Sequence, residues 1–137
     1  MKTTEERKRS RTILICLLLV VAVIVVTIAS NPLRRSNETI RENILKITPL
    51  GTSMEDVIKA IEENGWELDY VNEMYGFGRT ESGYRITDKP DLYGVKSVGA
   101  TLGIYYTPFI TYVEVGWGFD ENSKLINVGV WKSTSYL

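Results

Sequence analysis

Histidine is absent from the sequence of 137 residues, and cysteine occurs only once, as Cys16. Without histidine, the Ser-His-Asp and Cys-His nucleophile systems and most zinc sites are excluded. A single cysteine allows no disulfide within the chain. Cys16 follows Leu14 and Ile15 instead of the small residue that lipid attachment requires, so we expect a buried apolar side chain or a thiol at membrane level.

Charged residues are absent from Ile13 to Ser30, an apolar run of eighteen residues. A helix of this length extends about 27 Å, close to the thickness of about 30 Å of a bilayer's hydrocarbon core. The run is therefore predicted to be a transmembrane anchor. The basic residues before it favour a cytoplasmic N-terminus, although Arg34 and Arg35 weaken that bias. These preceding residues are Lys2, Arg7, Lys8, Arg9 and Arg11.

A cleavable signal peptide is the alternative, because Thr27-Ile28-Ala29 has small residues at the spacing of a cleavage site. We favour an uncleaved anchor, since the apolar run is longer than a typical signal-peptide core. Both alternatives export the rest of the chain. The predicted organisation is a basic cytoplasmic tail (1–12), a single-pass anchor in the cell membrane (13–30), a linker (31–36) and an extracytoplasmic domain (37–137).

Basic residues are not in excess in the exported part. Beyond residue 30 there are eleven Lys and Arg against fifteen Asp and Glu, a net charge of −4. Nucleic-acid binding needs a basic face, so we expect no nucleic-acid partner. Mild negative charge is typical of a domain kept soluble outside the cytoplasm.

Two short helices are predicted at the start of the exported part. The first follows the cap Ser36-Asn37, carries isoleucines at positions 40, 44 and 47, and ends before Pro49. The second extends from Met54 to Asn64 and is stopped by Gly65. Thr52 or Ser53 is its N-cap, and a capping box between Thr52 and Glu55 is expected. Its apolar stripe is Met54, Val57, Ile58 and Ile61.

The stretch Gly51-Thr52-Ser53 before this helix has the composition of a phosphate-binding loop. No lysine follows it as in a P-loop, and Glu55 and Asp56 already place negative charge at the positive end of the helix. We interpret the stretch as a helix start and not as a ligand site.

Strands are predicted beyond Gly65, where all fourteen aromatic residues lie. The two strands nearest the C-terminus form a hairpin around residues 120–124. The region 74–92 is expected to be a weak strand or a long hairpin loop, with a turn at Glu81-Ser82-Gly83. Alternation places one set of side chains toward the helices. These are Val98, Ala100, Leu102, Ile104, Tyr106, Val113, Val115, Trp117, Ile126, Val128 and Val130. An earlier strand is predicted at Trp66, Leu68 and Tyr70.

The predicted fold class is therefore α+β: one transmembrane helix, then two short helices packed on one face of an antiparallel sheet of three to four strands. The stretch from Gly51 to Val57 resembles the "glycine, any, Ser/Thr, three residues, valine" signature of the SmpA/OmlA (BamE-like) family. The hairpin from Gly118 to Val128 resembles the last hairpin of that family. The resemblance covers residues 37–137 and implies this fold, which the β-lactamase inhibitor protein shares, and an adaptor or binding function.

Acidic pairs are the remaining candidates for general acid–base chemistry. A helix surface, an exposed strand face or a turn explains each of them, and the acidic turn lacks the closing glutamate of a calcium loop. We therefore expect no enzyme activity, metal site or cofactor. The pairs are Glu62-Glu63, Glu67 with Asp69, and Asp120-Glu121.

The sheet face opposite the helices is the predicted partner-binding surface. Glycines there would form a shallow floor, and Tyr and Trp are enriched at protein interfaces. Ordinary strand composition, with aromatic side chains half-buried by loops, is the alternative interpretation. The candidate residues are Tyr105, Tyr112, Glu114, Trp131, Gly103, Gly116 and Gly129.

Three functions follow from these patterns. We favour a membrane-anchored, extracytoplasmic, non-enzymatic domain that binds a protein or peptide partner through this face. The first alternative is a cell-envelope sensor or enzyme for a small glycan or lipid ligand. The second is a structural spacer or a subunit of a larger membrane complex.

Overall fold

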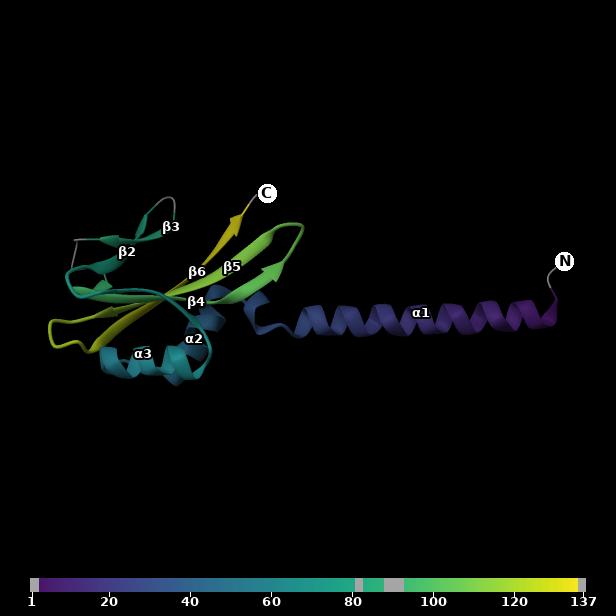
Figure 1. Cartoon of the computed structure of the whole chain (residues 1–137), viewed down its shortest axis with the longest axis horizontal. Coiled ribbons are helices and arrows are strands. Elements are labelled where there is room, and N and C mark those ends of the chain that lie inside the picture. Colours follow the sequence, from purple (N-terminus) through teal and green to yellow (C-terminus); the bar gives the residue numbers. More distant parts are fainter. Residues whose placement is uncertain (1–2, 81–82, 88–92, 136–137) are drawn as a thin grey trace. The chain divides into compact units, whose positions relative to one another are not determined.

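The computed structural model describes residues 3–80, 83–87 and 93–135. The chain divides into two compact units, Met1–Arg34 and Arg35–Leu137. The first unit contains helix α1 (Thr4–Ser30) and the short 3-10 helix η1 (Pro32–Arg34) (Figure 1). The second unit contains all the other elements.

Helix α1 contains the apolar run. Its first turn is closed by a capping box between Thr3 and Glu6, and none of its residues is buried. It is long and apolar enough to cross a membrane, and a signal sequence has the same properties. Cys16 lies exposed on this helix, inside the apolar run, so its predicted place at membrane level stays a prediction.

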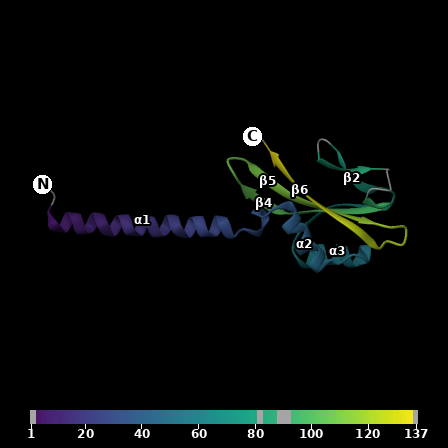
Figure 2. The ribbon, with the colours of Figure 1, turned by 180° about the vertical axis from the view of Figure 1, so that it is seen from behind.

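The second unit has the predicted α+β fold. Helices α2 (Asn37–Ile47) and α3 (Met54–Glu63) lie on one side of a four-stranded antiparallel sheet, and a small two-stranded sheet lies on the other side (Figures 1 and 2). The large sheet has the order β1-β4-β5-β6, and the small sheet pairs β2 with β3. The strands are β1 (Glu67–Asn72), β2 (Gly76–Thr80), β3 (Gly83–Thr87), β4 (Lys96–Tyr106), β5 (Ile110–Phe119) and β6 (Leu125–Ser135).

The β2–β3 hairpin occupies the region for which a weak strand or a long loop was expected. Its ladder runs from Gly76 opposite Thr87 to Thr80 opposite Gly83. Most of the predicted turn at Glu81-Ser82-Gly83 lies outside the described residues.

Helix α2 packs its isoleucines on the sheet. Ser36 caps it by accepting a hydrogen bond from the backbone N–H of Thr39. Ile40 and Ile44 are buried, whereas Ile47, the third isoleucine at this spacing, is 45% exposed. Thr48 turns inward in its place.

Helix α3 starts and stops at polar signals. Ser53 is the N-cap, accepting from the N–H of Asp56, and Thr52 instead donates its hydroxyl proton to the carbonyl of Pro49. The expected capping box with Thr52 is therefore not formed. At the other end Gly65 has φ 67°, and its N–H bonds to the carbonyl of Glu62, as glycine at a helix C-terminus commonly does.

The segment before α3 is held by the start of β6. The N–H of Gly51 donates to the carbonyl of Leu125, whose own N–H donates to the carbonyl of Thr52. The N–H of Met54 donates to the carbonyl of Ser123. The backbone N–H groups of Gly51 and Met54 are therefore used in hydrogen bonds within the protein, which agrees with the interpretation of Gly51-Thr52-Ser53 as a helix start.

The core lies between the two helices and the sheet. The predicted alternation of β5 is confirmed, because Val113, Val115 and Trp117 are fully buried. Ile126 is 45% exposed, so its predicted orientation toward the helices is wrong. A bulge between Gly118 and Phe119 shifts the register, which places Leu125 in the core in its stead.

Candidate functional site

A row of glycines crosses the sheet on the face opposite the helices, called here the outer face. Tyr70 on β1 pairs with Gly99 on β4, Gly99 with Gly116 on β5, and Gly116 with Gly129 on β6. Two of the predicted floor glycines, Gly116 and Gly129, lie in this row, whereas on β4 the member is Gly99 and not the predicted Gly103.

Aromatic rings of the same chain lie on this floor. A Cβ atom at Gly99 would overlap the Tyr70 ring, and one at Gly116 would lie 3.2 Å from the Phe77 ring. Phe77 comes from β2 and is fully buried, with its ring centroid 4.9 Å from that of Tyr93 and 6.5 Å from that of Trp131. Gly116 is thus covered by Phe77 and is not an open contact surface.

A β-bulge in β4 changes which side chains share the outer face. Thr101 is opposite Glu114 and Gly103 is opposite Val113, so Leu102 is an additional residue in the strand. Side chains after the bulge are inverted relative to the predicted alternation. Gly103 and Tyr105 move to the helix-bearing side, whereas the outer face gains two side chains predicted to face the helices, Ile104 and Tyr106.

Tyr105 confirms this inversion by its surroundings. It pairs with the buried Thr111, and the Nζ of Lys132 lies 5.5 Å from the centre of its ring. The same Nζ donates a hydrogen bond of 2.6 Å to the carbonyl of Arg35. Tyr105 therefore shares the Lys132 ammonium with Arg35, the first residue of the second unit, and does not lie with Tyr112 on the outer face.

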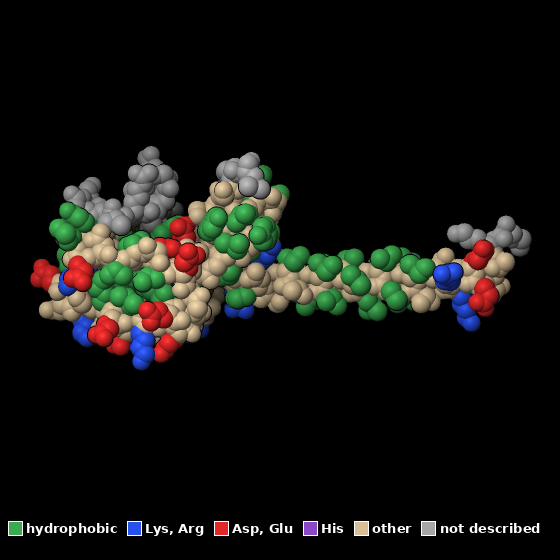
Figure 3. All heavy atoms as spheres, viewed as in Figure 1, with side chains coloured by type: hydrophobic (Ala, Val, Ile, Leu, Met, Phe, Trp, Pro, Cys, Tyr) green, Lys and Arg blue, Asp and Glu red, His purple; other side chains and the backbone are tan. Residues whose placement is uncertain are grey.

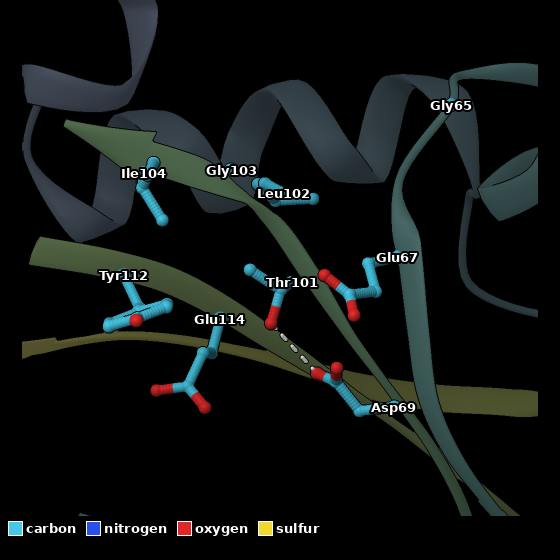
Figure 4. A pocket seen from close by; sticks show the side chains of 9 residues that line it. All are labelled: Gly65, Glu67, Asp69, Thr101, Leu102, Gly103, Ile104, Tyr112 and Glu114. Atoms are coloured by element: carbon cyan, nitrogen blue, oxygen red, sulfur yellow. Dashed lines mark hydrogen bonds between the residues drawn. The ribbon is translucent and has the colours of Figure 1, made fainter.

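The uncovered part of the outer face is a shallow, open groove of about 550 Å³ (Figure 4). Figure 4 shows side chains from β1, β4 and β5 converging on it. Of the predicted binding residues, Tyr112 and Glu114 line it, together with the backbone of Gly103. The full lining is Gly65, Glu67, Asp69, Thr101, Leu102, Gly103, Ile104, Tyr112 and Glu114.

One transverse row of side chains forms the centre of this acidic groove. Glu67 on β1 is opposite Thr101, Thr101 is opposite Glu114, and Glu114 is opposite Trp131 on β6. Trp131 is half-buried between this row and Phe77. Of the two aromatic residues predicted on this face that stay there, Tyr112 lines the groove and Trp131 lies beside it.

Hydroxyl groups hold two of the three carboxylates in place. Thr101 Oγ1 donates to Asp69 Oδ2 at 3.0 Å, and Ser133 Oγ donates to Glu114 Oε2 at 2.6 Å. Glu67 is exposed at the groove edge. Among the described residues that line the groove there is no Lys or Arg, so this lining is negatively charged next to the apolar side chain of Ile104.

Tyr70 follows Asp69 on β1, and its ring lies over Gly99. Burial raises the pKa of its hydroxyl to about 12. A hydrogen bond with Ser97 lowers the pKa, and the charges of Asp69 and Glu114 raise it. The charged form of this tyrosine is thus disfavoured next to the groove.

The sequence indicated only part of this site. Glu67 and Asp69 were identified as an acidic pair, and the structure brings both beside Glu114. The other pairs, Glu62-Glu63 and Asp120-Glu121, lie on α3 and in the β5–β6 turn. Among the described residues, no cluster of acidic or cysteine side chains has the geometry of a metal site. The bulge that brings Ile104 into the groove had no clear sequence signal apart from Gly103.

In comparisons with known proteins, no family model, no curated protein and no solved structure matches this chain. The resemblance to the SmpA/OmlA family therefore stays a prediction.

Proposed function

We propose that this protein is a membrane-anchored, extracytoplasmic binding domain without enzyme activity, and that its acidic groove holds a basic, partly apolar segment of a protein partner. The observation that carries the proposal is that Glu67, Asp69 and Glu114 line one groove with Ile104 and Tyr112, without a basic side chain among its described lining residues. A lysine or arginine of the partner would meet the carboxylates, and a neighbouring apolar side chain would meet Ile104 or Tyr112.

The shape of the groove favours a peptide over a small ligand. Small-molecule sites are usually concave and bury most of the ligand, whereas this groove is shallow and lies between strands. Asp69 and Glu114 also accept hydrogen bonds from Thr101 and Ser133, which fixes their orientation for recognition. These observations support binding of a protein segment over the glycan- or lipid-directed alternative.

Helix α1 supports anchoring, because it is long and apolar enough to span a bilayer. With the basic residues before it in the cytoplasm, the domain from Arg35 onward would lie outside. The resemblance to SmpA/OmlA proteins, which implies an adaptor function, points in the same direction.

The test compares the full-length protein with a groove variant, Glu67→Gln, Asp69→Asn and Glu114→Gln, after reconstitution into vesicles. The amides preserve the acceptors for Thr101 and Ser133 and remove only the charge. The matched control is Glu62→Gln, Glu63→Gln and Glu121→Gln, which removes three exposed carboxylates outside the groove. Binding of a fluorescent peptide of alternating lysine and leucine is measured by anisotropy, with a glutamate–leucine peptide as the charge-reversed probe.

We expect the lysine peptide to bind about tenfold more weakly to the groove variant, because exposed ion pairs contribute about 0.5 kcal/mol each. The control variant should bind like the wild type, and added salt should weaken wild-type binding. Equal binding by all three proteins would refute the groove as the site. A thermal shift with glycans or lipids, without peptide binding, would support the alternative function instead.

A further inference from the structure

The tip of the β4–β5 hairpin is an apolar surface that adjoins the acidic groove and extends beyond it. From Leu102 to Val113 the sequence contains no charged residue. Tyr106 is 64% exposed and Phe109 is 38% exposed. In Figure 3, hydrophobic side chains gather over this hairpin. The aromatic residues are therefore presented outward at one end of the sheet.

The β4 bulge places Ile104 and Tyr106 on the outer face of the hairpin. Ile104 is opposite Tyr112, and Tyr106 is opposite Ile110. Ile104 and Tyr112 are 42% and 39% exposed. The outer face of the hairpin is thus apolar up to its tip at Thr107–Phe109.

The same end of the sheet holds the start of the domain. Lys132 lies opposite Val113 and donates to the carbonyl of Arg35, the first residue of the second unit. Val113 and Phe109 are four residue steps apart, which is about 14 Å of extended chain. The backbone of Arg35 is therefore hydrogen-bonded to a β6 side chain whose partner on β5, Val113, lies about 14 Å along the chain from Phe109 at the hairpin tip.

The link between Arg35 and the apolar helix is short. Helix α1 ends at Ser30, and residues Pro32–Arg34 form the 3-10 helix η1. The five steps from Ser30 to Arg35 span at most about 17 Å, and the 3-10 turn shortens them. Anchoring by α1 would hold this end of the domain near the headgroup region, which is several ångströms thick on each side of a bilayer.

We propose that the β4–β5 hairpin tip docks on the surface of the membrane that α1 enters, with Tyr106 and Phe109 in the lipid headgroup region. Aromatic side chains are enriched at this depth, and the three basic residues near the domain start suit anionic headgroups. These basic residues are Arg34, Arg35 and Lys132. The inference rests on the proposed anchoring by α1, and it gives the domain a second membrane contact that would orient the acidic groove.

The experiment uses the full chain with Cys16→Ala and a single new cysteine, Thr107→Cys, labelled with an environment-sensitive fluorophore. Thr107 lies in the hairpin tip and leaves both aromatic side chains in place. The control label is at Asn122→Cys, in the exposed β5–β6 turn at the opposite end of the sheet. Both proteins are reconstituted into phosphatidylcholine–phosphatidylglycerol vesicles with nitroxide-labelled lipids, and flotation measures anchoring independently.

We expect blue-shifted, nitroxide-quenched emission at position 107 and neither effect at position 122. A further protein with Tyr106→Ser and Phe109→Ser should lose the quenching at 107 while still floating with the vesicles. Floating protein with an unquenched label at 107 would overturn the docking proposal alone. Protein that does not float would overturn the anchor and, with it, the docking. A label shielded from aqueous iodide without nitroxide quenching would assign the tip to a protein contact and also overturn docking.

Discussion

The indole Nε1 of Trp117 donates a hydrogen bond to Thr48 Oγ1 at 3.0 Å, and both side chains are buried. The same hydroxyl donates to the carbonyl of Ile44 at 3.1 Å. One threonine therefore joins the largest core side chain of the sheet to the end of α2.

Replacing Thr48 with valine should lower the free energy of unfolding by about 1–3 kcal/mol, because the indole N–H would lose its partner in the core. Urea unfolding in detergent micelles, followed by circular dichroism, measures the change. In a Trp117→Phe background the same substitution should cost clearly less. An equal cost in both backgrounds would show that the hydrogen bond contributes little.

Phe77→Ala should destabilise the domain by about 3–5 kcal/mol, because it removes a fully buried ring from the glycine floor. Phe109→Ala is the matched control, since Phe109 is 38% exposed at the hairpin tip. We expect the control to change stability by less than about 1 kcal/mol. Similar losses in the two variants would contradict the packing of β2 on the outer face.

Gly99→Ala should destabilise the domain by about 1–3 kcal/mol, because the added methyl group meets the Tyr70 ring. The cost should fall in a Tyr70→Ala background, where the ring is absent. A thermodynamic cycle from four urea titrations gives this coupling. Additive effects would mean that the backbone, and not the ring, requires glycine at this position.

Tyr70 should make stability depend on alkaline pH. Its pKa is raised from 10.0 to about 12, so the folded state keeps the proton over a range where the unfolded state has lost it. The contribution of Tyr70 to the free energy of unfolding is then fully present below pH 10 and decreases by roughly 2–3 kcal/mol as the pH rises toward 12. The difference in unfolding free energy between wild type and Tyr70→Phe, measured across this range, should shrink accordingly. A constant difference would contradict the raised pKa.

Much of the fold could be predicted from local patterns. The alternation of Val113, Val115 and Trp117 is uninterrupted, and Ser53 and Gly65 mark the ends of α3 by known capping chemistry. The errors in the strands lie at bulges, because one added residue inverts the alternation on one side of the bulge relative to the other. Ile126 and Tyr105 were misplaced for this reason.

The site was harder to predict than the fold. Gly116 and Gly129 were recognised as a floor, but composition does not show whether a floor is covered by the chain itself. Phe77 lies in a segment with weak strand character, and its contact with Gly116 joins positions far apart in the sequence. Of the groove, the sequence indicated only the separate residues Glu67, Asp69, Glu114 and Tyr112, and not that they lie together.

The additional residue at Leu102 also has an evolutionary consequence. Deleting one residue at this position would restore simple alternation in the second half of β4, carry Ile104 and Tyr106 beneath the sheet and bring Tyr105 out. The set of side chains on the outer face of the hairpin can therefore change when β4 gains or loses one residue, without substitution of any other residue. A domain built in this way can acquire a new contact surface through a single insertion or deletion event.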